Sequence, residues 1–394
     1  MPNNKAPGPD RFPVEFYKHF WPSLSPLFNR MISEIKQNAK LPTNMNTAII
    51  SLHLKPNKDP TLPSSYRPLS LMNTDTKIIS KALANRIQTV IHNLIHPDQT
   101  GFLQVRHSST NMRRLLNIID YTTHQKIPTA VVTLDAEKAF DRVNWKFLFT
   151  TLHKLGFGES FINWIKILYT APKATVNTNG VISQPFTLHR GTRQGCSLSP
   201  YLFSFFIEPL AATIQQNTNI KGIKTPSMEH KISLYADDIL LFLQKPDISI
   251  AETIQTIENY SKISDYSINW SKSTVLPINM NRLDDKFKTI PIPMCTNYIT
   301  YLGVRVSPQL SELFKLNFNP LTKTISDDLN RWTTLPISLI GRIATIKMSV
   351  LTKINYLFSM IPTQPPNIWF QSLNTSLTQF YWKNKPPRIK LYGI

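Results

Sequence analysis

The sequence predicts an α+β protein with two or three subdomains, on the basis of three observations. The chain has 394 residues, 41% of them hydrophobic, which suffices for a sizeable core but is long for one compact unit. Uninterrupted or β-branched apolar runs predict buried strands. Apolar residues that recur about every 3.6 positions predict amphipathic helices, and segments of both kinds occur along the chain without an internal repeat.

The charge balance favours a polyanionic partner. Lysine and arginine number 44 against 24 aspartate and glutamate residues, which gives a formal net charge of +20. We therefore expect nucleic acid as the partner, with an acidic membrane surface as the second choice. No apolar stretch reaches the roughly 18 residues of a membrane helix, and the first residues lack the apolar core of a signal peptide. An intracellular, soluble protein without a membrane partner is expected.

The cysteine and histidine content argues against disulfide bonds and against a structural zinc site. Only Cys196 and Cys295 are present, so a disulfide framework is excluded. The nine histidines are scattered without any Cys/His spacing that suits zinc, so no structural zinc is expected.

The first half of the chain predicts a loop, two helices and a strand. Residues 54–68 are rich in Pro and Lys and predict an exposed, positively charged loop. Residues 75–95 carry apolar side chains at the helical period and predict one core-facing helix. The β-branched run 128–135 predicts a buried strand, and residues 144–156 predict a helix closed by Gly156.

The second half predicts a long helix, a pair of strands and a helical C-terminal region. Pro200 suits the first position of a helix, and Pro209 inside the same helix is expected to kink it. Apolar runs on both sides of residues 237–238 predict two strands. Further helices are expected at residues 250–263, at about 320–334 and at 338–358.

Two adjacent acids, Asp237 and Asp238, interrupt the apolar run LYADDILLFL. Successive side chains of a straight strand point to opposite faces, so the two acids can act together only at a hairpin tip. Surface acids at a hairpin tip need no functional explanation. However, ILLFL does not alternate polar and apolar residues, which predicts a strand covered on both faces, and a charge beside such a strand is costly unless it is paired or metal-bound. A divalent cation is therefore the expected partner.

Two-metal phosphoryl chemistry needs at least one further carboxylate, and Asp135 is the candidate. It ends the predicted strand AVVTLD, where a side chain can project from the sheet towards a neighbouring hairpin tip. Taken alone, Asp135 fits a helix N-cap or a turn equally well. Five residues later, Phe140 is placed to pack beneath the sugar of a bound nucleotide and reject a 2′-hydroxyl group, although a lone Phe more often belongs to the core.

The loop RGTRQGCSLSPYLF, residues 190–203, is a candidate nucleotide contact. Its backbone can approach a sugar and base closely at Gly195, and Gln194 can hydrogen-bond to the ribose or a phosphate. The alternative is a flexible loop before an ordinary Ser-Pro helix start. In the basic loop upstream, Arg67 by bidentate contact and Lys55 as a point charge are candidates for binding a triphosphate, against the commoner solvated-surface role.

Three of these segments form an ordered set, namely LDAEKAFD, RGTRQGCSLSPYLF and YADD. The set resembles the palm of reverse transcriptases, specifically those of non-LTR (long interspersed element) retrotransposons. Each block alone is weakly specific, whereas the ordered series is highly specific and spans nearly the whole chain. The further blocks similar to that family are APGPDRFPVEFY (6–17), SYRPLSLMNTDTKIISKALANRIQ (65–88), QTGF (99–102), SINWSKS (267–273), YLGVRV (301–306) and LNRWTTLPISLIGRIATIKMSVL (329–351).

The resemblance implies a right-hand polymerase with fingers, a palm built on an antiparallel sheet backed by helices, and a helical thumb. Residues 1–128 would form the fingers and the leading palm helix. Residues 129–304 would form the palm with the catalytic motifs, with 157–193 partly in the fingers. Residues 305–394 would form the helical thumb and a truncated C-terminal segment.

The resemblance also assigns roles at the site of chemistry. Asp135, Asp237 and Asp238 would hold two Mg²⁺ ions, with Mn²⁺ as a substitute, one ion lowering the pKa of the primer 3′-hydroxyl and one neutralising the leaving pyrophosphate. Lys272 would be the proton donor to pyrophosphate, and Phe140 the sugar gate that favours deoxynucleotides.

The remaining implied contacts are with the nucleotide and the duplex. Gln194 and Gly195 would line the nucleotide pocket, and Lys55 and Arg67 would contact the triphosphate. The turn formed by Tyr301, Leu302 and Gly303 would grip the primer. Basic residues of the thumb would hold the template-primer backbone without reading its sequence, namely Arg331, Arg342 and Lys347.

The activity that follows is RNA-directed DNA polymerisation for a retrotransposon, in the nucleus or cytoplasm, with an RNA template, a DNA primer and dNTPs as partners. Some features depart from the family pattern: Tyr235 stands where many relatives carry Phe, and Pro209 is less usual. The family's endonuclease domain and Cys/His knuckle are also expected to be absent. The alternatives are a catalytically silent nucleic-acid-binding remnant, a maturase-like RNA-binding protein and, more weakly, a metal-dependent nuclease.

Overall fold

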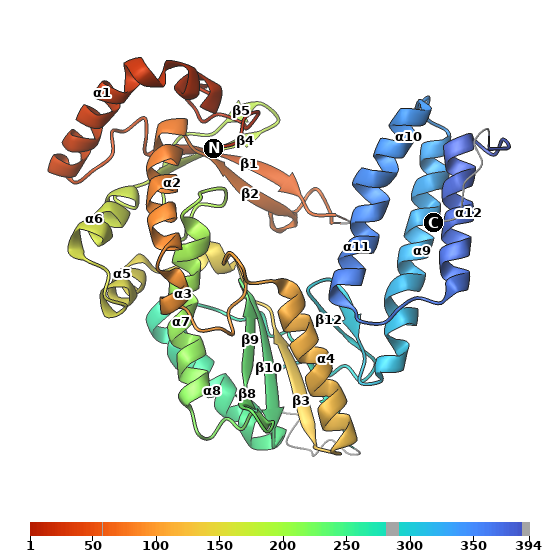
Figure 1. Ribbon diagram of the computed structural model, residues 1–394. Coiled ribbons are helices and arrows are strands. Elements are labelled where there is room, and N and C mark those ends of the chain that lie inside the picture. The colour runs from red at the N-terminus through yellow and green to blue at the C-terminus, as the bar shows by residue number, and fades with distance from the viewer. Residues whose placement is uncertain (57, 281–290, 388–394) are drawn as a thin grey trace.

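The computed structural model describes residues 1–56, 58–280 and 291–387. An N-terminal region combines helices with a five-stranded sheet, a central region places a four-stranded sheet between helices, and a C-terminal region is a column of helices (Figure 1). Helices and largely antiparallel sheets occur in separate layers, so the predicted α+β class is confirmed. The predicted domain boundaries near residues 128 and 305 stay predictions.

The N-terminal sheet joins two distant stretches of sequence. Its strands lie in the order β2-β1-β4-β5, β6 also pairs with β4, and the β1–β4 pair is parallel. The helices α1 and α2 belong to the same region (Figure 1). The bounds are α1 (Val14–Asn38), β1 (Thr47–Leu54), β2 (Tyr66–Leu71), α2 (Thr74–Gln88), β4 (Lys173–Thr178), β5 (Val181–Ile182) and β6 (Phe186–Thr187).

Two expectations for this region need correction. The predicted loop 54–68 ends earlier, because β2 begins at Tyr66 and Arg67 pairs with His53 of β1. The single helix predicted at 75–95 is two helices, α2 and the short α3 (Ile91–Leu94). The break falls at the β-branched pair Thr89 and Val90, and the Thr89 hydroxyl donates a hydrogen bond of 2.8 Å to the carbonyl of Arg86, which competes with helix continuation.

The central sheet has the order β11-β3-β10-β9, and all neighbouring strands are antiparallel. The helices α7 and α8 pack on it from one side and α4 from the other (Figure 1). The strand predicted at 128–135 is β3. The bounds are α4 (Ser108–His124), β3 (Thr129–Leu134), α7 (Ser199–Gln216), β9 (Ile232–Tyr235), β10 (Asp238–Gln244), α8 (Pro246–Ser264) and β11 (Thr274–Ile278).

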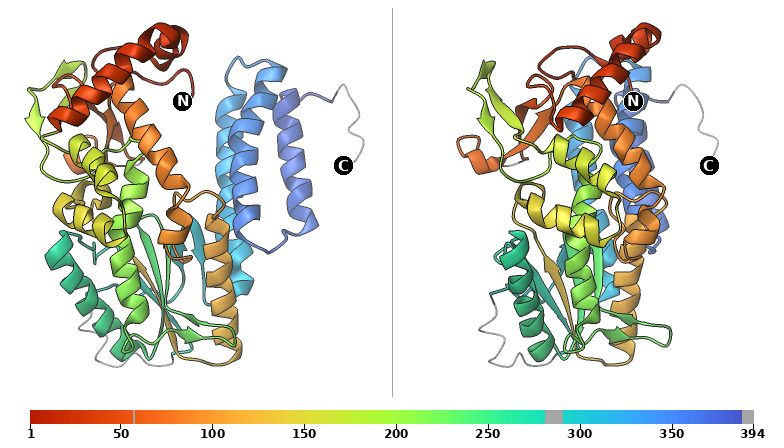
Figure 2. Two further views of the ribbon diagram at one scale, coloured as in Figure 1. Left: turned by 60° about the vertical axis from the view of Figure 1, so that its left-hand side comes forward. Right: turned by 90° about the vertical axis from the view of Figure 1, so that its left-hand side faces the viewer.

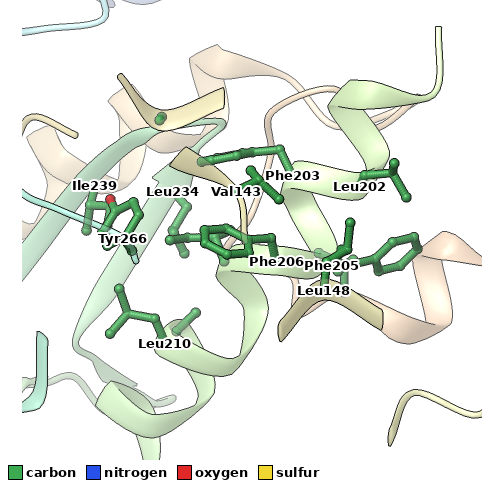
Figure 3. Packing of buried hydrophobic residues seen from close by; sticks show 14 of the residues in the cluster. Val143, Leu148, Leu202, Phe203, Phe205, Phe206, Leu210, Leu234, Ile239 and Tyr266 are labelled. Carbon is green, nitrogen blue, oxygen red and sulfur yellow. The ribbon is translucent and has the colours of Figure 1, made fainter. Parts of the chain in front are cut away.

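Strand β10 is covered on both faces, as its uninterrupted apolar run predicts. Ile239 and Leu241 belong to the core cluster shared with α7 and α8, whereas Leu240 and Phe242 belong to the cluster shared with α4 and the C-terminal helices. Figure 3 shows Ile239 next to Tyr266, on the side of the sheet where α7 packs. Each fully buried apolar side chain contributes about 1.5–3 kcal/mol to the free energy of unfolding, so this strand is anchored firmly.

The connection from β3 to α7 follows the predicted order of elements. Asn144 caps α5 by accepting a hydrogen bond from the backbone N–H of Phe147, and Gly156 with φ 81° follows the helix, as predicted. Pro200 lies in the first turn of α7, and Pro209 lies inside it; the expected kink stays a prediction. The bounds are α5 (Trp145–Lys154), α6 (Glu159–Leu168), β7 (Ile223–Lys224) and β8 (Glu229–His230), with a 3₁₀ turn at Ala139–Arg142.

The C-terminal helices stand beside the central sheet as a separate column (Figure 2). α11 packs against α4, and α9 packs against β13. None of the helices in the described parts of the chain combines the length and apolar character needed to cross a bilayer. The bounds are β12 (Ile299–Tyr301), β13 (Val304–Val306), α9 (Leu313–Thr333), α10 (Leu339–Thr345), a π-helical turn (Ile346–Val350), α11 (Leu351–Met360) and α12 (Asn367–Trp382).

The helical pattern predicted for this column holds with two corrections. The helix expected at about 320 begins at Leu313, so Pro320 lies inside it rather than at its start. The single helix expected at 338–358 contains the π-helical turn between α10 and α11. Such π-helical turns are rare and occur as single turns inside α-helices, so an uninterrupted helix is the default prediction.

Candidate active site

Three carboxylates come from the same end of the central sheet. Asp238 is the first residue of β10 and pairs with Tyr235 of β9 across a two-residue turn, so the predicted hairpin tip is present. On the other side of β10, Ile239 pairs with Leu134 of β3, and Asp135 is the next residue after β3. The antiparallel register therefore puts Asp135 beside Asp238.

The turn between β9 and β10 has an unusual backbone. Ala236 is its first residue and has φ 57°, in the left-handed region that side chains other than Gly rarely adopt. Asp237 follows directly. This tight reversal brings Asp237 and Asp238 to one end of the sheet, which a straight strand could not do.

The pKa values of Asp237 and Asp238 are raised by burial and by neighbouring acids. Burial, together with the charges of Asp237 and Asp135, raises the pKa of Asp238 from 3.8 to about 6. Burial, opposed by a backbone hydrogen bond and assisted by the charge of Asp135, also raises the pKa of Asp237. Both shifts express mainly the cost of burying negative charge, to which the neighbouring carboxylates add, and a bound cation would offset this cost.

The chemistry of the donor set fits a hard divalent cation. Carboxylate oxygens are the ligands that Mg²⁺ prefers, and no soft ligand belongs to the set. Within the described residues, no three His, Cys, Asp or Glu side chains converge on one point as a single metal cluster. Mg²⁺ is usually held by one or two carboxylates together with water and substrate phosphates, so a bound substrate would supply the remaining ligands.

Lys272 lies next to the acids. Its Nζ is 3.9 Å from Oδ2 of Asp135. The segment that carries it is tied to Asp135 by the backbone: the N–H of Asn269 donates to the carbonyl of Asp135, and the N–H of Asp135 donates to Oγ of Ser273. The loop that contains Lys272 is thus held against the end of β3.

Phe140 lies in the 3₁₀ turn that follows Asp135, at the border of the core. Its ring stacks on that of Phe203 of α7, with centroids 4.7 Å apart, and meets the edge of Phe102 at 5.9 Å. Its carbonyl accepts a hydrogen bond of 2.7 Å from the N–H of Thr192. The predicted gate is therefore joined to the predicted nucleotide loop, and its role as a gate stays a prediction.

The loop 190–203 contacts strand β2 of the N-terminal sheet. The N–H of Ser70 in β2 donates to the carbonyl of Gln194 at 2.9 Å. Gly195 has φ 101°, and a Cβ added there would lie 3.1 Å from the carbonyl oxygen of Ser70 and 3.3 Å from a methyl group of Leu69. Glycine is therefore needed at this position for its backbone conformation, as well as for the close approach.

The two predicted triphosphate contacts occupy different settings. Arg67 is exposed on β2, on the same face as Leu69, which lies beside Gly195. Lys55 follows β1 and donates a hydrogen bond of 2.9 Å from Nζ to the carbonyl of Ser64. Arg67 thus lies on the face of β2 that borders the nucleotide loop, whereas Lys55 is engaged within its own loop.

The predicted primer-gripping turn is the tip of the β12–β13 hairpin. Tyr301 pairs with Val304, and the two turn residues Leu302 and Gly303 have φ 47° and 73°. The carbonyl of Leu302 accepts a hydrogen bond from the hydroxyl of Tyr356 in α11. Tyr301 is buried, and burial raises the pKa of its hydroxyl. The turn therefore joins the central region to the helical column, and its contact with a primer stays a prediction.

One of the basic residues predicted to hold the duplex needs a different role. Arg342 is buried, and its guanidinium donates to the carbonyls of Tyr381 at 2.9 Å and Ile337 at 2.8 Å. A guanidinium satisfied by backbone carbonyls inside the helical column is not available for phosphates, so Arg342 is reassigned as a structural link to the end of α12. Arg331 and Lys347 are exposed.

Several residues near the site escaped the sequence-based prediction. Tyr266 is buried, its hydroxyl has no hydrogen-bond partner among the described residues, and its pKa is raised by burial and by all three acids. Asn111 donates from Nδ2 to the carbonyl of Leu234 at 2.8 Å and to the hydroxyl of Tyr301 at 3.3 Å. Gln99 forms hydrogen bonds with Ala236 in the turn between β9 and β10. In the sequence, only the block QTGF (99–102) singles out Gln99, and it does not indicate what the residue does.

Comparison with known proteins gives a consistent picture. The family model described as "Reverse transcriptase (RNA-dependent DNA polymerase)" matches residues 54–306. A transposon TX1 uncharacterized 149 kDa protein of Xenopus laevis is 33% identical over 392 residues, which is 98% of this chain and 29% of that protein. A Pol polyprotein from the type-1 retrotransposable element R2 of Popillia japonica is 28% identical over 219 residues, 55% of this chain and 30% of that protein. The chain thus spans under a third of the length of either relative.

A further relative and a solved structure extend the comparison. The RNA-directed DNA polymerase from mobile element jockey of Drosophila funebris is 27% identical over 230 residues, 58% of this chain and 24% of that protein. The structure of telomerase from Candida tropicalis in complex with a fragment of telomeric RNA superimposes with a TM-score of 0.51 at 11% identity, over 91% of this chain and 58% of that one. This likeness shows the fold alone, and the predicted right-hand polymerase architecture is confirmed.

Proposed function

This chain belongs to the reverse transcriptase (RNA-dependent DNA polymerase) family, and we propose that it extends the 3′-hydroxyl of a DNA primer with dNTPs on an RNA template, as part of a non-LTR retrotransposon. The observation that carries the proposal is the placement of Asp135, Asp237 and Asp238 at one end of the central sheet, where burial and neighbouring carboxylates raise the pKa values of Asp237 and Asp238. Acids crowded in this way are poised to bind cations.

Members of this family use divalent metal ions, and the three carboxylates would hold two Mg²⁺ ions, with Mn²⁺ as a substitute. When bound, the ions supply activation of the primer 3′-hydroxyl and neutralisation of the charge on the leaving pyrophosphate. Lys272, beside Asp135, is positioned to give a proton to the pyrophosphate oxygen as it leaves.

The residues around the acids would select and hold the nucleotide. Phe140, backed by Phe203, presents an apolar ring that would leave no room for a 2′-hydroxyl group. Gly195 lets the backbone of the nucleotide loop approach closely, and Arg67 on the adjoining face of β2 would bind the triphosphate. Attack in line on the α-phosphate then needs only positioning and charge stabilisation from the protein.

The duplex would be held without reading its sequence. The net charge of +20 supports binding to the phosphate backbone, and the exposed Arg331 and Lys347 lie in the helical column that would form the thumb. The turn at Leu302 and Gly303, braced by Tyr356, would contact the primer near its 3′ end.

Primer extension tests the proposal. Labelled oligo(dT) annealed to poly(A), with Mg²⁺ and dTTP, should be lengthened by the wild-type protein and not by Asp237→Ala. Both proteins should shift the duplex in a gel at moderate salt, because phosphate contacts supply most of the affinity. If both proteins bind the duplex and neither extends it, the chain is a catalytically silent nucleic-acid-binding remnant and the proposal is wrong.

A further inference from the structure

The side chain of Gln99 binds both backbone polar groups of Ala236, the first residue of the catalytic turn. Oε1 of Gln99 accepts a hydrogen bond of 3.0 Å from the N–H of Ala236, and Nε2 of Gln99 donates one of 3.3 Å to the carbonyl of Ala236. Gln99 is 1% exposed, so water does not compete for these bonds.

The orientation of this amide is determined by its partners. Oε1 of Gln99 also accepts a hydrogen bond of 2.8 Å from the N–H of Gly101. Two backbone N–H groups point at the same atom, and only the oxygen of a glutamine amide can accept from both. Nε2 of Gln99 is thereby directed to the carbonyl of Ala236. One orientation of the amide thus satisfies all three hydrogen bonds.

The backbone on either side of Gln99 is fixed to the same hairpin. The N–H of Thr100 donates to the carbonyl of Leu234 at 2.9 Å, and the N–H of Leu234 donates to the carbonyl of Asp98 at 2.9 Å. The segment 98–101 thus pairs with β9 in a short parallel arrangement. It follows β9 as far as the turn.

Gly101 closes the contact from the other side. A Cβ added to Gly101 would lie 2.1 Å from the nitrogen of Ala236 and 2.8 Å from its Cα. Both of these neighbours are backbone atoms, so no side chain could move aside. Glycine at this position lets the segment press directly against the turn.

We propose that Gln99 is a positioning residue that holds the Ala236–Asp237 turn in its left-handed conformation and thereby sets the direction of the Asp237 and Asp238 carboxylates. This inference rests on the proposed polymerase function. Gln99 touches neither substrate nor metal; it acts through the backbone of Ala236. A non-glycine residue at positive φ persists only where its surroundings hold it, and the amide of Gln99 supplies two of the required bonds.

Two variants test this from opposite sides of the turn. Gln99→Met keeps the length of the side chain and removes all three hydrogen bonds. Gly101→Ala keeps Gln99 and pushes on Ala236. The matched control is Ile257→Ala, which removes a buried side chain of α8 and so lowers thermal stability without removing any of the three hydrogen bonds of Gln99.

The first measurement is hydrogen exchange followed by mass spectrometry, which needs no activity. We expect both turn variants to accelerate exchange about tenfold or more in the peptide that covers Leu234–Asp238, whereas Ile257→Ala leaves that peptide protected. Unchanged protection of the turn in Gln99→Met would overturn the inference, whether or not the wild-type protein polymerises.

The second measurement is the affinity for Mn²⁺, followed by electron paramagnetic resonance, together with the single-nucleotide extension rate. In Gln99→Met both should fall about 10–100-fold, with the KM for dTTP and the affinity for the duplex little changed. A loss of Mn²⁺ affinity with wild-type duplex affinity supports positioning. Equal Mn²⁺ affinity and equal extension in wild type and Gln99→Met would contradict it while leaving the polymerase function intact.

Failure of the proposed function gives a different pattern. If the wild-type protein binds Mn²⁺ but does not extend the primer, the polymerase proposal is wrong, and the Mn²⁺ affinity and exchange data still decide the role of Gln99. If it neither binds Mn²⁺ nor extends, the exchange of the turn peptide alone decides whether Gln99 holds the turn.

Discussion

The ammonium group of Lys272 lies 3.9 Å from the carboxylate of Asp135, although the two residues belong to separate blocks of the sequence. Their side chains are 67% and 44% exposed, so solvent screens the pair and its contribution to stability is at most about 1 kcal/mol. The contact therefore contributes little to stability, and its importance is that it places Lys272 beside the three acids.

Replacing Lys272 should affect turnover far more than folding. Lys272→Met removes the proposed proton donor, so the single-nucleotide extension rate should fall about 10²-fold or more, while Lys272→Arg keeps part of the activity. The thermal midpoint should move little in either variant. Lys262→Met, on the exposed surface of α8, is the matched control and should extend at the wild-type rate. An unchanged rate in Lys272→Met would remove the assignment.

The raised pKa of Asp238 predicts how stability depends on pH when no divalent ion is present. The pKa is about 6 in the folded chain against 3.8 for the free group, so between these values the folded state binds more protons than the unfolded state. The free energy of unfolding contributed by this group should therefore increase as the pH falls from about 7 to about 4.

Thermal denaturation in EDTA measures this directly. Asp238→Asn should melt higher than wild type at about pH 7.5, and the difference should shrink towards about pH 4, where Asp238 is protonated. Added Mg²⁺ should stabilise wild type more than Asp238→Asn, since the ion needs the carboxylate. Asp120→Asn, on the exposed side of α4, should show neither effect. A wild-type protein that melts higher than Asp238→Asn at neutral pH without metal would contradict the electrostatic account.

The ring of Phe140 is packed between Phe203 and Phe102, so its position is set by both neighbours. Phe140→Val should raise the ratio of ribonucleotide to deoxynucleotide incorporation by about tenfold or more, because a smaller side chain leaves space for the 2′-hydroxyl group. Phe102→Leu should raise it less, by loosening the ring. Phe161→Val, in α6, is the control for loss of a partly buried ring and should keep the wild-type ratio.

The buried guanidinium of Arg342 predicts a structural defect. Arg342→Met leaves the carbonyls of Ile337 and Tyr381 without donors, so the free energy of unfolding should fall by about 1–3 kcal/mol in urea titrations. Lys347→Met, at an exposed position, should change stability by less than about 0.5 kcal/mol but reduce the salt dependence of duplex binding by about one counterion. Equal losses of duplex affinity in both variants, with stability unchanged, would restore Arg342 to the duplex-binding set.

The parts of the fold that the sequence predicts well are those specified by local pattern. The run ILLFL correctly predicts a strand buried on both faces: helices cover both sides of the sheet, so the strand needs no alternation of polar and apolar residues. The strand before Asp135 and the helix from Asn144 to Gly156 carried their own cap and turn signals. The sequence pattern does not predict helix α1, because Pro22 and Pro26 lie inside it and proline usually interrupts a helix.

The parts of the site that the sequence could not reveal depend on contacts between distant residues. The acids were found because carboxylates in an apolar run are conspicuous. Gln99 and Asn111 look like ordinary polar residues in the sequence, and their roles appear only when the fold brings them to Ala236 and Leu234. The misassigned Arg342 shows the converse limit: charge alone does not tell a buried guanidinium from a phosphate-binding one.

The central claim is that Asp135 and the Asp237–Asp238 turn share bound divalent ions. Iron(II) in place of Mg²⁺, with ascorbate and hydrogen peroxide, cleaves a protein backbone next to the bound metal. The account predicts cleavage of the wild-type chain near both residue 135 and residues 237–238, with both cuts suppressed by excess Mg²⁺ and lost together in Asp237→Ala. Cleavage near only one of the two segments, or at both segments undiminished in Asp237→Ala, would contradict it.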